Sequence, residues 1–276
     1  ISEEDAFMQI KSFLSFMPQN IYEISEKIDC DDPVERQEEE LLSIIPKDRK
    51  RSYEMRDIVK LVFDKNSFFE MTKYFGRGII TGFARINGYP VAIFANDSNF
   101  YAGSMSAEGA QKTTRFIKLC DTFKLPIVSL VDEPGFLIGP DAEKAGTILH
   151  GTEAVLATTE SQVPWTTIMI RKSFGVAAAA HYGPDGYVLA WPSAESGPLP
   201  LEGGVAVAFK KEIAAAKDPE AKRKELEEKM AKNQNPFPRA EAFSVHEIID
   251  PRETRKYIAL WAERIQSQLK ASLVMK

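Results

Sequence analysis

Short, almost uninterrupted apolar runs alternate with helical patterns along most of this 276-residue chain, and this alternation restricts its fold more than any other feature. Apolar runs rich in β-forming residues occupy positions 79–86, 91–95, 127–131, 165–170 and 187–191. Helical patterns occupy positions 55–64, 105–123, 142–159, 205–216 and 218–232, and one more follows Asp250-Pro251. Strands that are apolar on both faces and alternate with helices are typical of a sheet covered by helices on both sides. The sequence therefore predicts an α/β fold, with a hairpin where Asn87-Gly88 joins the first two strands.

The first 45 residues differ in pattern from the rest of the chain. Positions 2–16 show apolar residues at near-helical spacing, and Ser2 stands three residues before Asp5, which is a helix-capping signal. An acidic connector follows at positions 30–40 and is interpreted as a solvated linker. We therefore predict an N-terminal helical arm and linker over residues 1–45 and one domain over residues 46–276. Because residue 1 is Ile rather than Met, we also expect that further sequence precedes it.

Composition excludes several classes of function. The formal net charge is −5, from 40 acidic and 35 basic residues, so electrostatics gives no reason to expect a nucleic-acid or lipid partner. No apolar run reaches the length of about 20 residues that a membrane-spanning helix needs. The histidines His150, His181 and His246 are far apart and show no metal-ligand spacing, so we expect no metal. The two cysteines, Cys30 and Cys120, cannot build a disulfide framework, which favours a reduced, cytosol-like compartment.

Two turns rich in small residues follow predicted strands, which is where α/β folds place ligands. The first turn is VDEPGF at positions 131–136, and the second is FGVAAAA at positions 174–180. The second turn is predicted to open a helix, whose first amides are unpaired and lie at the positive end of the helix dipole. Two adjacent amides in such a place can stabilise an oxyanion. Tight packing of a helix on the sheet would use the same small residues, so the pattern alone does not separate the two interpretations.

A series of short motifs runs through nearly the whole chain in a fixed order. They stand at positions 43–48, 53–56, 64–70, 82–88, 95–97, 115–121, 126–128, 131–136, 171–175, 190–195 and 249–255. The last three read RKSFG, AWPSAE and IDPRETR. Taken together, the series resembles the C-terminal carboxyltransferase domain of biotin-dependent acyl-CoA carboxylases, of the propionyl-CoA carboxylase β-subunit type.

This resemblance implies a crotonase-like ββα superhelix, a fold of the ClpP/crotonase type. It also implies transfer of a carboxyl group from carboxybiotin to the α-carbon of a short acyl-CoA, with biotin on a carrier protein and no metal. In this family one chain contains two such domains, and the active site forms between opposed domains of two subunits. Because the motifs match only the C-terminal domain, the chain would supply the biotin-side half of the site.

The resemblance also assigns site residues by position. The backbone amides of Val176 and Ala177 would form the oxyanion hole that stabilises negative charge on the biotin ureido oxygen. The residues expected to contact biotin are Gly135, Phe136, Phe174 and Gly175, and those expected to line the substrate are Ala178, Ala179 and His181. A structural role for His181 remains an alternative. The family usually has a glycine at the position of Val176, a tyrosine at that of Ala178, and a residue that influences specificity at that of Ala179. Because this chain differs at all three positions, the resemblance does not identify the acyl group of its substrate.

Partners follow from the same resemblance. They are an N-terminal carboxyltransferase domain or subunit, biotin carboxylase, and biotin carboxyl carrier protein, in a homo-oligomer such as a dimer or a trimer of dimers. The expected location is the cytoplasm, or the mitochondrial matrix in a eukaryote. Two alternatives remain at this point: the carboxyltransferase subunit of a biotin-dependent decarboxylase, and a non-catalytic assembly module whose altered positions 178–179 and 196–202 no longer serve catalysis.

Overall fold

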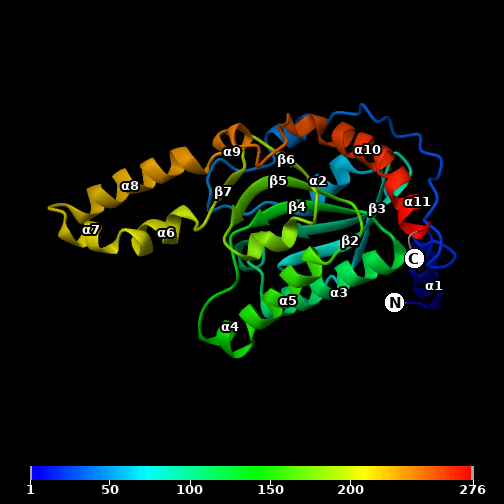
Figure 1. Ribbon diagram of the computed structural model, residues 1–276, viewed down its shortest axis with the longest axis horizontal. Helices are drawn as coiled ribbons and strands as arrows, with labels where there is room; N and C mark the ends of the chain where they lie inside the picture. The colour runs from blue at the N-terminus through cyan, green and yellow to red at the C-terminus, as the bar shows by residue number, and fades with distance from the viewer. Residues whose placement is uncertain (1, 275–276) are drawn as a thin grey trace.

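A mixed sheet runs through the centre of the computed structural model, which describes residues 2–274 (Figure 1). Within these residues the sheet has eight strands in the order β1-β2-β3-β4-β5-β6-β8, and β7 pairs with β5 beyond the end of β6. The strands are β1 (Phe69–Met71), β2 (Ile79–Ile86), β3 (Tyr89–Asn96), β4 (Ile127–Glu133), β5 (Trp165–Phe174), β6 (Tyr187–Ala190), β7 (Glu195–Gly197) and β8 (Glu247–Ile248). The predicted strands are all present, and β5 continues four residues beyond its expected end at Ile170.

The predicted hairpin at Asn87-Gly88 is confirmed. Strands β2 and β3 pair antiparallel from Ile79↔Asn96 to Ile86↔Tyr89. Both turn residues have positive φ, +49° at Asn87 and +79° at Gly88, as this tight turn requires. Strands β3, β4, β5 and β6 then run parallel to one another, and each is joined to the next by a crossover connection that contains an α-helix or a 3₁₀ helix.

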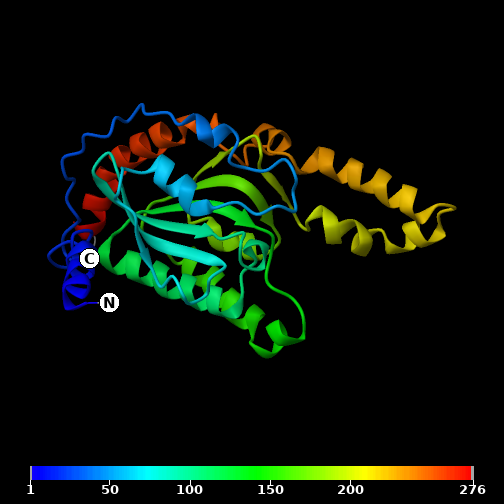
Figure 2. The same cartoon turned by 180° about the vertical axis from the view of Figure 1, so that it is seen from behind.

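Helices cover both faces of the sheet (Figures 1 and 2). Helices α3 (Ala107–Phe123) and α5 (Thr147–Thr159) lie on one face, and α2 (Met55–Val62), α10 (Thr254–Arg264) and α11 (Gln266–Val274) lie on the other. Neighbouring residues of β2 enter different cores: Ile80 packs with α2 and α10, whereas Ile79 packs with α3. Because both faces are buried, the strands are apolar at nearly every position.

The N-terminal helix forms as predicted. Helix α1 (Glu3–Leu14) begins with a reciprocal capping box between Ser2 and Asp5. Its end packs on the sheet, since the Phe13 and Phe16 rings lie 6.0 Å and 5.7 Å from the Phe83 ring between centroids. The short 3₁₀ helix η1 (Glu39–Leu42) closes the connector. The proposed boundary at residue 45 stays a prediction.

The acidic connector contains a buried ionic cluster, so its interpretation as a solvated linker is wrong at Asp32. The Arg36 Nε donates to Asp32 Oδ1 at 2.6 Å, and the Arg255 guanidinium bonds to Asp64 at 2.8 Å and to the Asp32 carbonyl at 2.8 Å. Arg255 is fully buried, so its charge needs these partners. Other acidic residues of the connector are exposed as expected, namely Asp31, Glu35, Glu39 and Glu40.

An arm projects from the body of the molecule (Figure 1). It consists of α6 (Leu201–Ala208), α7 (Lys210–Ala215) and α8 (Pro219–Gln234), and α9 (Phe237–Glu241) leads back to β8. Asp218 caps α8 through the amides of its first turn. Helix α6 begins at Leu201 and encloses Gly203-Gly204, so the helix predicted to follow this pair begins earlier. In the part of the chain that is described, no helix combines the length and apolarity needed to cross a membrane.

The predicted helix over residues 142–159 is two helices. The first is α4 (Pro140–Lys144), and α5 begins at Thr147 after Gly146, whose φ of +72° interrupts the helix. Figure 2 shows α4 as a separate protrusion below the sheet. This break arises because Gly146 adopts a left-handed conformation at little steric cost. A helical pattern alone does not reveal such a break.

Candidate active site

The two turns singled out in the sequence lie at the same edge of the sheet. Strands β4 and β5 are parallel neighbours, and Glu133 near the end of β4 pairs with Ser173 near the end of β5. Both following glycines have positive φ, +131° at Gly135 and +64° at Gly175. The structure therefore brings together the predicted biotin-contacting residues Gly135 and Gly175, at the carboxyl ends of parallel strands.

A buried ion pair fixes the geometry of this edge. Asp132 lies at a register shift of β4 and bonds to Arg171 of β5, with Nη2 to Oδ2 at 2.8 Å and Nε to Oδ1 at 3.1 Å. Arg171 also donates to the Arg51 carbonyl at 2.8 Å, and its guanidinium lies 4.7 Å from the centroid of the Tyr53 ring. A bidentate pair of this kind orients both strands as well as neutralising two buried charges.

The Glu133 carboxyl group holds the first turn in place. Its Oε1 accepts from the Gly135 amide at 2.9 Å and from the Met105 amide at 3.3 Å. Its Oε2 accepts from Asn96 Nδ2 at 3.0 Å. Burial nevertheless raises the pKa of Glu133 to about 8, because these bonds offset only part of the lost hydration.

The side chain of His181 is enclosed in the core. Its Nδ1 lies 2.9 Å from Ser129 Oγ, and its ring stacks on Phe94 with 4.2 Å between centroids. Its Nε2 lies 3.7 Å from Glu133 Oε2, and no described residue forms a hydrogen bond with it. Burial lowers the pKa of His181 to about 3, so the ring is neutral. This geometry matches the structural role that the sequence left open, and it places His181 away from any substrate pocket described below.

The second turn forms a tight loop rather than the start of a long helix. The expected helix is the 3₁₀ helix η3 (Ala177–His181), five residues long. The Gly175 amide donates to the Gly197 carbonyl at 3.1 Å, which ties the loop to β7. The Val176 side chain is 69% exposed, whereas Ala177 and Phe174 are fully buried. The loop therefore exposes the Val176 side chain at the surface, while the residues on either side of the Gly175-Val176 pair are buried.

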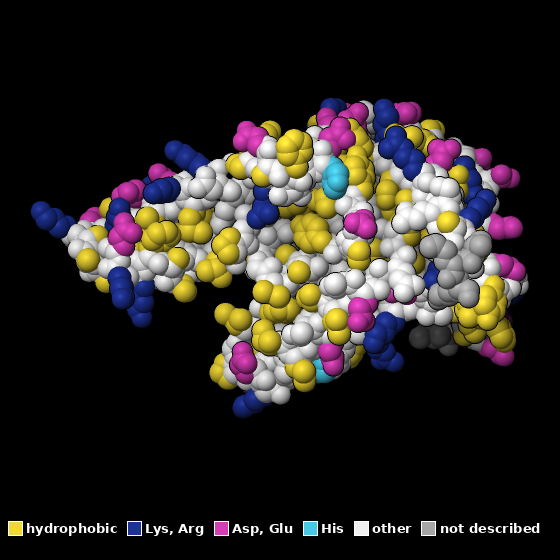
Figure 3. Space-filling model, viewed as in Figure 1, with side chains coloured by type: hydrophobic (Ala, Val, Ile, Leu, Met, Phe, Trp, Pro, Cys, Tyr) yellow, Lys and Arg dark blue, Asp and Glu magenta, His cyan; other side chains and the backbone are white. Residues whose placement is uncertain are grey.

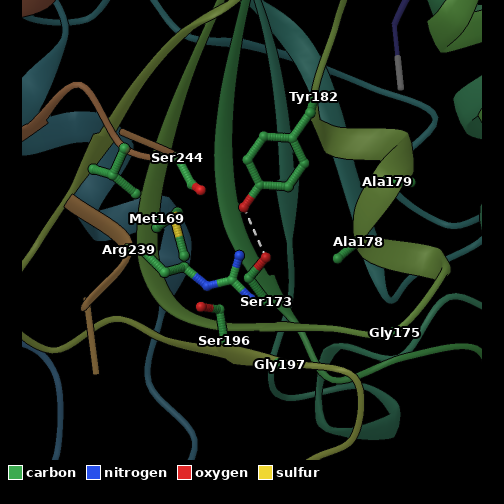
Figure 4. Close-up of a pocket in the computed structure, with 11 residues that line it drawn as sticks. Met169, Ser173, Gly175, Ala178, Ala179, Tyr182, Ser196, Gly197, Arg239 and Ser244 are labelled. Carbon is green, nitrogen blue, oxygen red and sulfur yellow. Dashed lines mark hydrogen bonds between the residues drawn. The ribbon is translucent and has the colours of Figure 1, made fainter. Parts of the chain in front are cut away.

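A pocket of about 320 Å³ lies beside this loop (Figure 4). On one side it is lined by small residues of the loop, Gly175, Ala178 and Ala179. On the other sides it is lined by polar side chains, namely Ser173, Tyr182, Ser196 and Arg239. Figure 4 shows the Arg239 side chain reaching into the pocket and the Tyr182 hydroxyl meeting Ser173 Oγ, at 2.7 Å. The predicted substrate-lining residues Ala178 and Ala179 therefore do line a pocket.

Sequence reasoning missed the polar lining of this pocket. Arg239 and Ser196 lie on either side of the arm, 43 positions apart in the numbering, and neither belongs to a motif with a recognisable spacing. The only signal was the run Ser196–Glu202, which departs from the family pattern near the active site. Among the described residues, no group of three or more His, Cys, Asp or Glu side chains is arranged to hold a metal ion.

The Phe136 ring packs directly on α5 at Gly151, where a Cβ would lie 2.3 Å from the ring. We expect Gly151→Ala to destabilise the protein by about 1–3 kcal/mol, because the ring or the helix must move. Urea denaturation measures this cost. The matched control is Gly203→Ala in α6, where no atom lies within 4 Å of the added Cβ. If the clash is the cause, Phe136→Ala removes most of the cost of Gly151→Ala; an unchanged cost in that background would contradict the explanation.

Comparison with known proteins gives consistent matches. The profile of the family described as carboxyl transferase domain matches residues 1–273. A propionyl-CoA carboxylase carboxyltransferase subunit from Haloferax mediterranei is 37% identical over 275 residues, which cover 98% of this chain and 53% of the relative. The methylmalonyl-CoA decarboxylase subunit alpha of Propionigenium modestum is 35% identical over 265 residues, 94% of this chain and 51% of the relative. The chain thus spans about half the length of these curated relatives.

A solved structure has the same fold. The transcarboxylase 12S structure with methylmalonyl-coenzyme A and methylmalonic acid bound, described as a hexamer assembly, matches with a TM-score of 0.88 and 36% identity. The match covers 94% of this chain and 51% of that chain. The predicted crotonase-like α/β fold is confirmed.

Proposed function

This chain belongs to the carboxyl transferase domain family, and we propose that it is the C-terminal, biotin-side half of an acyl-CoA carboxyltransferase. Its reaction is the transfer of a carboxyl group between carboxybiotin and the α-carbon of an acyl-CoA. The observation that carries the proposal is the loop Gly175–Ala179, which follows β5, lies next to the turn after β4, and borders a pocket. Family membership and this geometry support the same assignment.

The loop fits a flat ring that approaches the backbone. A Cβ at Gly175 would find only the Pro198 carbonyl, at 3.6 Å, so the space beside Gly175 is open. Gly175 also has a φ of +64°, which other residues adopt only with strain. Biotin, when bound as carboxybiotin, supplies the carboxyl group. The amides of Val176 and Ala177 are proposed to donate to the ureido oxygen, where they stabilise negative charge without exchanging a proton.

The site needs a second domain on its open side. Figure 3 shows a hollow between the arm and the α4–α5 protrusion, with apolar side chains on both sides. Large apolar side chains are exposed in these elements or directly before them: Ile138, Ile148, Leu149 and Val207. Exposed apolar patches of this kind mark interaction sites. We propose that an N-terminal carboxyltransferase domain covers this hollow and holds the CoA, and that biotin carboxylase and biotin carboxyl carrier protein supply carboxybiotin.

A complementation assay tests the proposed function. The chain is mixed with the polypeptide that carries the N-terminal domain, free biotin and malonyl-CoA or methylmalonyl-CoA, and release of CO₂ is measured. We expect biotin-dependent decarboxylation only when both polypeptides are present. Omitting biotin or the N-terminal polypeptide provides the controls. Absence of biotin-dependent turnover with every acyl-CoA tried would contradict an enzymatic role and favour an assembly module.

The identities of the relatives do not separate the two directions of transfer. A carboxylase subunit is 37% identical and a decarboxylase subunit is 35% identical to this chain. The proposal therefore concerns the transfer step, which both share. Purification of the native complex resolves the direction: an ATP-dependent biotin carboxylase indicates carboxylation, and a membrane pump subunit indicates decarboxylation.

A further inference from the structure

The pocket beside the loop contains a cation without a protein partner. Arg239 lies in α9, where the chain returns from the arm, and it is half-buried and lines the pocket. Among the described residues, no side chain forms an ion pair with Arg239, and none accepts a hydrogen bond from its guanidinium. This differs from Arg171 and Arg255, whose guanidinium groups are buried and bonded to carboxylates. A guanidinium that is partly desolvated and unpaired is suited to an anionic ligand.

Hydroxyl groups surround the same space. Ser196 is 4% exposed, and no described residue forms a hydrogen bond with its buried Oγ. The Tyr182 and Ser173 hydroxyls bond to each other at 2.7 Å, and each oxygen retains capacity for a second bond. Figure 4 shows Ser196, Ser173 and Tyr182 around the Arg239 side chain. The unpartnered Ser196 hydroxyl is an independent sign that a polar ligand completes this site, because buried polar groups in proteins are normally paired.

The shape of the pocket and its place restrict the ligand. Its volume of about 320 Å³ lies at the lower end of the range for small-molecule sites. Ala178 and Ala179 of the proposed transfer loop line it with small side chains, and Met169 and Val245 add apolar walls. One guanidinium with neutral hydroxyls matches a single planar carboxylate, which accepts two parallel bonds from arginine. The apolar walls match a short methylene chain that carries this carboxylate.

We propose that this pocket is a carboxylate subsite for the acyl chain, so that the acyl-CoA substrate carries a free carboxylate remote from its α-carbon. The proposal rests on the proposed function, since it places the pocket beside the transfer loop. Arg239 binds the remote carboxylate, Ser196 donates to the same group, and Met169 and Val245 contact the intervening methylenes. The substrate class is the CoA thioester of a short dicarboxylic acid.

Direct binding tests the subsite without any need for transfer activity. Glutarate and its uncharged analogue glutaramide are titrated into the full chain, with isothermal calorimetry or NMR shifts as the readout. We expect saturable binding of glutarate and not of glutaramide. Arg239→Gln is expected to weaken glutarate binding by about tenfold or more, as loss of a charged hydrogen-bonding partner does. The matched control is Arg223→Gln on the exposed face of α8, which should bind as the native chain does.

A second variant keeps the charge of Arg239 but fills the pocket with a larger side chain. Ala178→Phe is expected to abolish glutarate binding while Arg239 remains, and thermal unfolding reports whether each variant is folded. Equal glutarate binding by the native chain and Arg239→Gln, or no saturable glutarate binding by a folded native chain, would overturn the proposal. Equal binding of glutaramide would also overturn it, because the pocket would then not select a charge.

Turnover shows whether Arg239 acts on the remote carboxylate of the acyl chain or on the carboxyl group that is transferred. In the complex with the N-terminal polypeptide, kcat/KM is compared for glutaryl-CoA and butyryl-CoA as carboxyl acceptors. We expect a preference for glutaryl-CoA that Arg239→Gln removes, with butyryl-CoA little affected. An equal loss on both substrates would show that Arg239 acts on the group common to both reactions and would overturn the proposal. Transfer to butyryl-CoA without glutarate binding refutes the subsite alone, whereas glutarate binding without any transfer refutes the proposed function.

Discussion

Replacement of Ala177 with proline is expected to reduce kcat for biotin-dependent carboxyl transfer by about 10²–10³-fold, the usual cost of losing one oxyanion-hole donor. Proline has no amide hydrogen, so one of the two proposed donors disappears. The substitution lies in the first position of η3, the position at which a helix tolerates proline. The assay is the complementation reaction with free biotin.

The residue before a proline disfavours helical angles, and Val176 has φ −71° and ψ −31°. A loss of activity could therefore reflect a changed loop rather than a missing donor. Ala178→Pro is the matched control, because it imposes the same restriction one residue later and leaves both proposed donors in place. Ala177→Gly keeps the amide and should retain activity within a few fold. Equal losses for the two proline variants would mean that the oxyanion hole is placed wrongly.

Removal of the carboxylate of Asp132 is expected to destabilise the fold by about 3–5 kcal/mol, because it leaves the Arg171 guanidinium buried and unpaired. Asp132 is fully buried and accepts three hydrogen bonds from Arg171 and one from the Lys172 amide. Urea denaturation of Asp132→Ala measures the loss as a lower midpoint with an unchanged slope. Since the pair lies at the ends of β4 and β5, the same substitution should also reduce transfer activity.

Two controls show whether charge burial causes this cost. Lys60→Ala breaks an exposed ion pair with Asp57 and should cost less than about 1 kcal/mol. The double substitution Asp132→Leu with Arg171→Met removes both charges and should recover a large part of the stability lost in Asp132→Ala. A double variant that is no more stable than Asp132→Ala would contradict the explanation based on an unpaired buried charge.

The sequence predicted the features that depend on local pattern. The Asn87-Gly88 hairpin follows from a two-residue turn signal, and the apolar strands follow from burial on both faces of the sheet. The sequence also predicted that the turns at Gly135 and Gly175 each follow a strand, and the structure adds that these two strands are parallel neighbours. The family resemblance supplied the fold type and the assignment of the loop, which composition and spacing alone left open.

The features that the sequence did not reveal depend on contacts between distant positions. Arg255 bonds to the Asp32 carbonyl across 223 positions, and no local pattern indicates that an acidic linker is anchored in this way. The enclosed position of His181 depends on its contacts with Phe94 and Ser129 from two other strands. Arg239 reaches the pocket only because the chain returns after the arm, so its role could not be read from the charged sequence around it.

The arm begins after β7 and ends before α9, and residues that flank it on each side, Ser196 in β7 and Arg239 in α9, line the pocket. The Gln234 side chain donates to the Leu199 carbonyl at 3.0 Å and ties these ends together. A change in length near α7 would therefore leave the base of the arm, and with it this hydrogen bond, in place. The base of the arm thus lies beside the pocket, and the rest of the arm extends away from it.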